Sequence, residues 1–166
     1  MKARHALTAL LALTTVTAVA CDDDDEDPNG PPDTNTFQAD LSGAQEVPPV
    51  TTTTATGTAQ FISSTSGGTT TIQYTVTVTG DLTGPVTAAH IHGPAGTGTN
   101  ANPIVTLTVS NATGTTGVLV SGSFTMTGNA SINMQQLLTH MLAGNTYVNL
   151  HTAANPNGEI RGQISD

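Results

Sequence analysis

The chain has 166 residues, of which 36% are hydrophobic, 3% aromatic and 9% charged. Three basic residues stand against 12 acidic ones, which excludes a nucleic-acid binder that neutralises phosphates with lysine and arginine. A single cysteine excludes an internal disulfide and a thiolate-based zinc site. The length is typical of one domain, and no apolar run reaches the roughly 18 residues of an ordinary membrane span.

Residues 1–20 have the pattern of an export signal. Lys2 and Arg4 provide a positive start, residues 6–20 form a short apolar and threonine stretch, and small residues at 18–20 suit a signal peptidase. Cys21, which follows directly, makes this segment similar to the lipobox of bacterial lipoproteins. The resemblance implies that Cys21 carries lipid and anchors an exported protein to a bacterial membrane. The alternative is an ordinary secretory signal that leaves a free thiol at Cys21.

The segment after Cys21 combines charge repulsion with proline. Residues 22–27 are all acidic, and residues 28–33 contain three prolines, which interrupt helices and strand ladders. We therefore expect a disordered tether over residues 21–35. The acidic run lacks the spaced ligands and the turn glycine of a calcium loop, so the solvated tether is the better interpretation.

From residue 36 onward, threonine, valine, isoleucine, glycine and serine dominate in short alternating runs. In residues 70–79, Ile72, Tyr74, Val76 and Val78 share one face, and threonine and glutamine lie on the other, which is typical of a half-buried strand. Further runs of this kind span residues 37–41, 57–62, 86–92, 103–109, 117–127, 146–152 and 159–164. About eight strands separated by turn signals predict an all-β fold, an antiparallel Greek-key-like β-sandwich or a barrel.

One segment has helical rather than alternating periodicity. Its apolar side chains are three and four residues apart, which predicts one short amphipathic helix over about residues 133–142. Ser131 or Asn133 can cap its start, and Gly144 can end it. The apolar positions, whose methionines are spaced as core residues rather than as copper ligands, are Met134, Leu137, Leu138, Met141 and Leu142.

Three histidines are the strongest candidates for chemistry. His90 and His92 are two residues apart on a predicted strand and therefore share a face. His151 ends another predicted strand, on the same face as Tyr147 and Asn149. Three neutral imidazoles from neighbouring strands would suit copper or zinc. A His-x-His pair on such a strand is distantly similar to the copper half of copper/zinc superoxide dismutases.

A structural role for the same histidines stays open beside the metal hypothesis. An imidazole at a strand end often donates one hydrogen bond to a carbonyl and accepts another, and residues 155–158 offer such a loop. Of the other histidines, His5 belongs to the signal, and His140 lies on the polar flank of the predicted helix.

Arg161 is the only cation after the signal, and it shares a strand face with Glu159. The simpler interpretation is a structural arginine that bonds to Glu46, Glu159 or loop carbonyls. The alternative is an anion-binding arginine beside the histidines. Nothing in the sequence fixes a separation that would pair Glu46 and Glu159 for acid–base catalysis. We find no nucleophile elbow and no phosphate-binding loop, and therefore predict no catalytic residues.

Three blocks carry a family resemblance: LSGAQEVPPV with ATG over residues 41–57, AHIHGPA over 89–95, and LAGNTYVNLHT with NPNGEIRGQ over 142–163. Their order and spacing resemble the CHRD domain, found in the growth-factor antagonist chordin and in many exported bacterial proteins. The resemblance covers about residues 36–164. It implies a β-rich extracytoplasmic domain with no established enzymatic activity in the bacterial members. The growth-factor role does not carry over, because the cysteine-rich modules of chordin are missing.

These observations predict a signal over residues 1–20, a lipidated tether over 21–35 and a CHRD domain over 36–166. The expected function is a non-catalytic binding or scaffold module held at the membrane through Cys21, with a protein or an extracellular polymer as its partner. The alternative function is a copper- or zinc-binding protein that uses His90, His92 and His151.

Overall fold

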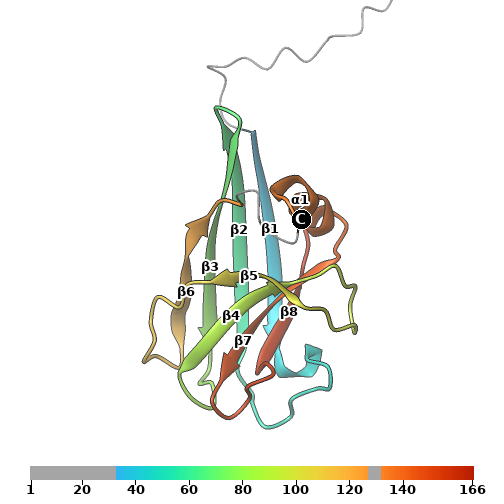
Figure 1. Cartoon of the computed structure of the whole chain (residues 1–166). Helices are drawn as coiled ribbons and strands as arrows, with labels where there is room; N and C mark the ends of the chain where they lie inside the picture. The colour runs from blue at the N-terminus through green and yellow to red at the C-terminus, as the bar shows by residue number, and fades with distance from the viewer. Residues whose placement is uncertain (1–32, 127–131) are drawn as a thin grey trace, which may run out of the picture. The chain divides into compact units, whose positions relative to one another are not determined.

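The computed structural model describes residues 33–126 and 132–166 (Figure 1). The predicted signal, Cys21, the acidic run and the possible cap Ser131 lie outside the described residues. The described residues belong to one compact unit. Its described elements are β1 (Asp33–Ser42), η1 (Gly43–Gln45), β2 (Thr56–Ser66), β3 (Thr69–Thr79), β4 (Val86–His92), β5 (Pro103–Leu107), β6 (Gly117–Phe124), α1 (Met134–Leu142), β7 (Thr146–Thr152) and β8 (Ile160–Ile164).

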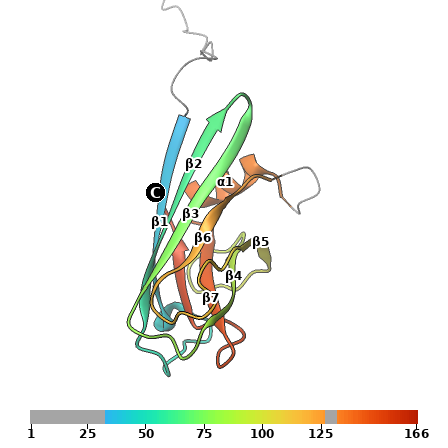
Figure 2. The ribbon, with the colours of Figure 1, turned by 90° about the vertical axis from the view of Figure 1, so that its left-hand side faces the viewer.

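All eight of these strands pair antiparallel in one sheet, in the order β5-β4-β7-β8-β1-β2-β3-β6. The sheet curls until its two edges meet, and a bridge between Val109 and Val120 joins the segment after β5 to β6. Figure 2 shows the long strands β1, β2 and β3 on one side and β4, β5 and β7 on the other. The predicted all-β antiparallel fold is confirmed. The two layers of strands that lie on opposite sides of the core belong to a single, nearly closed sheet.

The alternation read from the sequence decides which side chains fill the interior. In β3, Ile72, Tyr74, Val76 and Val78 are buried, and Gln73 is exposed, as predicted. The same rule applies across the sheet. The inward residues of β4 and β7, which belong to the hydrophobic core, are Ala89, Ile91, Val148 and Leu150.

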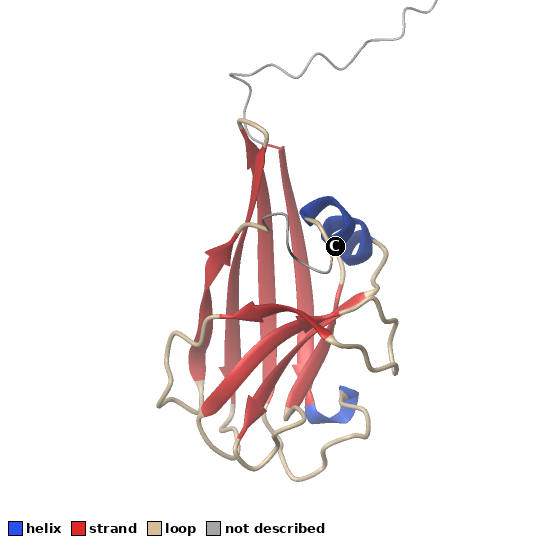
Figure 3. Cartoon of the chain, in the orientation of Figure 1, coloured by secondary structure: helices blue, strands red, loops and turns tan. Residues whose placement is uncertain are grey.

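The helix α1 confirms the second periodic pattern (Figure 3). Asn133 and Gln136 form a reciprocal capping box, in which each side chain accepts a hydrogen bond from the backbone N–H of the other. Leu137 and Met141 are fully buried against the core, and Gly144 follows the last turn with a φ of 62°.

The strand β1 begins earlier than the sequence indicated. Residues 33–35, which we assigned to the tether, pair with residues 63–65 at the far end of the β2–β3 hairpin. These residues are polar, and their place in the sheet comes from backbone hydrogen bonds rather than from an apolar pattern. No helix of the described residues is long and apolar enough to cross a membrane.

Gly162 lies where β8 passes closely over β1. A Cβ atom at Gly162 would stand 2.5 Å from the carbonyl oxygen of Asp40, which is backbone and cannot turn aside. We expect Gly162→Ala to lower the free energy of unfolding by about 2 kcal/mol, measured by urea denaturation. The control is Gly84→Ala, where a Cβ meets nothing within 4 Å, with an expected change within about 0.5 kcal/mol. Equal effects of the two substitutions would contradict this close approach.

Candidate metal centre

The outer face of β4, β7 and β8 carries polar side chains directly behind the core residues of the same strands. The register places His90 opposite Asn149, and Asn149 opposite Arg161. It likewise places His92 opposite Tyr147. These side chains point away from the core, and all of them except the half-buried His90 are nevertheless buried, with Asn149 at 2% and Arg161 at 1% exposure. Loops therefore cover this part of the sheet and enclose a polar layer.

The three predicted histidines meet in this layer. One ring nitrogen each of His90, His92 and His151 lies within 4.8 Å of the other two. Nδ1 of His90 is 3.0 Å from Nε2 of His151. His92 and His151 are buried, whereas His90 is half-buried and forms the more open side of the cluster.

Backbone carbonyls fix two of these rings. Nδ1 of His92 donates to the carbonyl of Ala101 at 2.9 Å, and Nδ1 of His151 donates to the carbonyl of Pro156 at 2.9 Å. In a neutral imidazole with its proton on Nδ1, the Nε2 atom carries a lone pair that can accept a hydrogen bond or bind a metal ion. A carbonyl that holds the distal N–H is also the usual support of a metal-binding histidine. The tautomers of both rings therefore suit a metal ion.

The spacing of the ligand atoms is close to what a small transition-metal ion needs. A tetrahedral ion with nitrogen ligands at about 2.0–2.1 Å places those nitrogens about 3.4 Å apart. The largest separation in the cluster is 4.8 Å, so modest side-chain rotations close the site. His90 would contribute Nδ1, and His92 and His151 would contribute Nε2.

The surroundings favour the neutral form of His90 and His92. Burial lowers the pKa of His90, and the neighbouring His151 and His92 lower it further. Burial also lowers the pKa of His92, against the opposing effect of its hydrogen bonds with the carbonyl of Ala101 and the side chain of Asn149. Metal ions bind deprotonated imidazole, so the lowered pKa values of His90 and His92 favour the form that a metal ion would require.

A stack of planar groups supports His92 from the side. The rings of His92 and Tyr147 are parallel within 3°, with their centroids 4.7 Å apart. The guanidinium carbon of Arg161 lies 3.3 Å from the centroid of the Tyr147 ring. Because β7 runs between β4 and β8, Tyr147 is held between the imidazole and the cation.

Arg161 bonds to the covering loop. Its Nη1 donates to Oδ1 of Asn100 at 3.0 Å, and its Nη2 donates to the carbonyl of Thr99 at 2.8 Å. Burial lowers the pKa of Arg161, against the opposing effects of Tyr147 and Glu46. The arginine thus fixes the loop that also holds His92.

Glu159 has partners of its own, away from the histidines. It is fully buried and accepts hydrogen bonds from the backbone and hydroxyl of Thr83, from the hydroxyl of Thr152 and from Asn155. Burial raises the pKa of this carboxyl, but the bonds from Thr152 and Thr83 outweigh it, and the pKa lies below its usual range. Glu159 is therefore a charged anchor between loops rather than half of a carboxylate pair.

Glu46 lies on the other side of the polar layer, where Asn149 connects it to His92. It is 6% exposed, and its Oε1 has no hydrogen-bond partner among the described residues. Burial raises its pKa to about 7, although Arg161, Asn149 and Val47 act in the opposite direction. Sequence analysis placed Asn149 on the correct face but did not identify it as the link between Glu46 and His92.

The amide of Asn149 adapts to the protonation of its neighbours. Its Oδ1 lies 3.0 Å from Nε2 of His92. The amide NH₂ makes the same contact when the group turns end for end, which a His92 ring protonated at Nδ1 requires. Asn149 is therefore a contact that a metal ion at Nε2 of His92 would replace.

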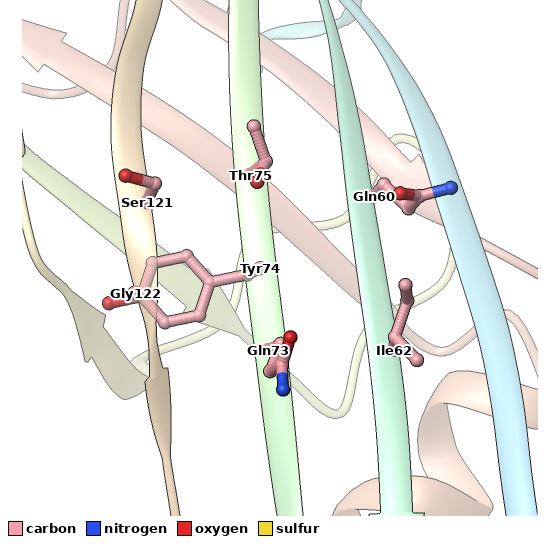
Figure 4. Close-up of a pocket in the computed structure, with 7 residues that line it drawn as sticks. All are labelled: Gln60, Ile62, Gln73, Tyr74, Thr75, Ser121 and Gly122. Atoms are coloured by element: carbon pink, nitrogen blue, oxygen red, sulfur yellow. The ribbon is translucent and has the colours of Figure 1, made fainter.

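A hollow of about 230 Å³ lies elsewhere, on the part of the sheet formed by β2, β3 and β6 (Figure 4). The hydroxyl of Tyr74 already accepts a hydrogen bond from the backbone N–H of Thr108. No histidine, acidic or basic side chain lines this hollow, so it offers little chemistry beyond neutral hydrogen bonding. Its lining residues are Gln60, Ile62, Gln73, Tyr74, Thr75, Ser121 and Gly122.

Comparison with protein families gives one match. The profile of the CHRD domain matches residues 37–164, which include β2 to β8, most of β1 and every side chain of the candidate centre. No curated protein and no solved structure matches the chain significantly.

The buried carboxyl of Glu46 makes stability depend on pH. Its pKa rises from 4.5 to about 7 on folding, so the folded protein binds the proton more tightly, and stability falls as the pH rises between these values. We expect Glu46→Gln to remove this loss. Relative to the wild type, the variant should gain about 2 kcal/mol in unfolding free energy between pH 5 and pH 8, measured with urea. An equal difference at both pH values would contradict the raised pKa.

Proposed function

The chain belongs to the CHRD domain family, and we propose that it is an exported, non-catalytic binding module that holds one copper or zinc ion. The ligands are His90, His92 and His151. The observation that carries the proposal is the convergence of three imidazole nitrogens within 4.8 Å, and burial favours the neutral form of two of the rings, His90 and His92. Imidazole is a ligand that suits both zinc and copper.

A purely structural role is the alternative. The carbonyls of Ala101 and Pro156 hold Nδ1 of His92 and His151, while Nε2 of His151 lies 3.0 Å from Nδ1 of His90 and Nε2 of His92 lies 3.0 Å from the amide of Asn149. Hydrogen bonds among the three imidazoles themselves amount to the one between His90 and His151. The metal proposal is supported by the short distances, because a single ion could replace these inner contacts of all three rings at once.

Three protein ligands leave a coordination position for a further group. The half-buried His90 lies on the open side of the cluster, so this position would be reached from there. The proposal includes no catalytic step. In this proposal the domain binds the ion, and its metal-loaded surface contacts a protein or an extracellular polymer.

The sequence pattern of residues 1–35 supports a further part of the proposal. An export signal over residues 1–20 would deliver the chain across the membrane, and lipid on Cys21 would anchor it there. The acidic segment would then hold the domain away from the bilayer surface. Residues 1–32 lie outside the described part of the chain.

Metal binding is tested by calorimetric titration of the full chain with zinc and copper. We expect one equivalent to bind with a Kd below about 1 μM. His92→Ala and His151→Ala should each weaken this binding at least about 100-fold, because each removes a ligand. His140→Ala, a histidine of α1 outside the cluster, is the matched control and should leave it unchanged. Equal binding by all the variants would contradict the proposed ligands.

Lipid anchoring is tested by labelling with a fatty-acid analogue during expression in a bacterial host. The wild type should incorporate the label and sediment with membranes, because the acyl chains on Cys21 hold it there. Cys21→Ser should lose both properties while the domain remains folded. Sedimentation of Cys21→Ser with membranes would contradict anchoring through this residue.

A further inference from the structure

A cleft of about 300 Å³ lies beside the candidate metal centre. One wall is formed by the segment that follows β1, with apolar contributions from Ala44, Val47 and Pro49, and the other by residues 97–98. Arg161 and Glu46 line it together with Gln163. Its volume is at the lower end of the range for small-molecule sites, and a few polar groups converge within mainly apolar walls, as such sites require.

Arg161 is the residue of this cleft whose buried charge favours the binding of a ligand. It is the only lysine or arginine among the described residues, and it is 1% exposed. Its hydrogen bonds go to neutral oxygens of Thr99 and Asn100 and use two of its five N–H groups. Buried charges are normally paired, because the loss of hydration is otherwise uncompensated.

The acidic residue that lines the cleft does not neutralise the buried charge of Arg161. Glu46 attracts Arg161 through space, but the recorded hydrogen bonds of the guanidinium within residues 33–126 and 132–166 include no carboxylate. Burial favours the protonated form of the Glu46 carboxyl up to about pH 7, by raising its pKa. The guanidinium therefore retains donors and a positive charge on a wall of the cleft.

We propose that this cleft binds a small monocarboxylate, whose carboxylate accepts hydrogen bonds from Arg161 and whose short apolar chain lies against Ala44, Val47 and Pro49. The planar guanidinium fork matches a carboxylate in geometry. A single cation balances a single negative charge, so a monoanion fits better than a phosphate ester or a dicarboxylate. The site goes beyond the metal proposal, because none of its residues is a proposed metal ligand.

The test uses nuclear magnetic resonance of the isotope-labelled full chain, freed of metal on a chelating resin. Butyrate should cause saturable shifts at Thr97, Gly98 and the side chains of Gln163 and Arg161. The neutral analogue butyramide should bind at least about tenfold more weakly, because it lacks the charge-assisted bonds to the arginine. Acetyl-alanyl-alanine and its amide, tested in the same way, distinguish a peptide terminus from a free acid as the source of the carboxylate.

Variants at exposed positions keep the test independent of folding. Ala44→Trp should fill the cleft and weaken butyrate binding at least about tenfold, and Ala112→Trp, exposed on a loop that does not line the cleft, is the matched control. A third variant changes the buried Glu46: at pH 8, where its carboxyl is mostly ionised, Glu46→Gln should strengthen butyrate binding by about threefold, because it removes a competing negative charge.

The proposal would be overturned by equal binding of butyrate and butyramide, by shifts that never saturate, or by unchanged butyrate binding in Ala44→Trp. The titration is also repeated with His92→Ala. If this variant has lost metal binding and still binds butyrate as the wild type does, the two proposed sites are independent of each other. Abolished butyrate binding in a folded His92→Ala would contradict the placement of this site at Arg161.

Discussion

The candidate centre depends on one constraint, the register between β4 and β7. Successive side chains of a strand alternate between faces, so the pairing that buries Ala89 and Ile91 also turns His90 and His92 outward. The same pairing brings His151 within reach of His90. A slip of one residue would place imidazoles in the core and aliphatic side chains under the loops. Core packing therefore selects the arrangement that assembles the histidines.

The loops over this face turn it into a second buried layer, one built from polar groups. The carbonyls of Ala101 and Pro156 orient two imidazoles, and Thr99 orients Arg161. The stack of Arg161, Tyr147 and His92 then connects the proposed carboxylate cleft to the candidate metal centre. The guanidinium carbon of Arg161 lies 3.3 Å from the centroid of the Tyr147 ring, and that centroid lies 4.7 Å from the centroid of the His92 ring. The single cation of the described domain thus supports an internal site instead of contributing to the charge of the exposed surface.

Local patterns in the sequence predicted the structural features that depend only on residues close together in the chain. Alternation located the strands, the spacing of Leu137 and Met141 located the helix, and the interval between His90 and His92 placed both on one face. Contacts between distant segments leave no such pattern. The proximity of His151 requires the β4–β7 pairing, and the carbonyls that orient the rings belong to loops without periodicity.

The same limit explains the residues whose roles emerged only from the structure. Asn149 was placed on the correct face, but its position between Glu46 and His92 depends on how the segment after β1 folds over the sheet. The partners of Arg161 lie about 60 residues earlier in the chain, on a loop that no strand pattern predicts. Residues 33–35 joined β1 through backbone pairing alone.

The central claim is that three imidazoles bind one ion, and zinc X-ray absorption spectroscopy of the full chain tests it most directly. With one equivalent of zinc, the account predicts nitrogen ligands at about 2.0–2.1 Å and the outer-shell scattering of imidazole rings. Both signals should be lost when His92 and His151 are replaced by alanine. A shell of oxygen ligands alone, as the acidic residues 22–27 would provide, would contradict the account.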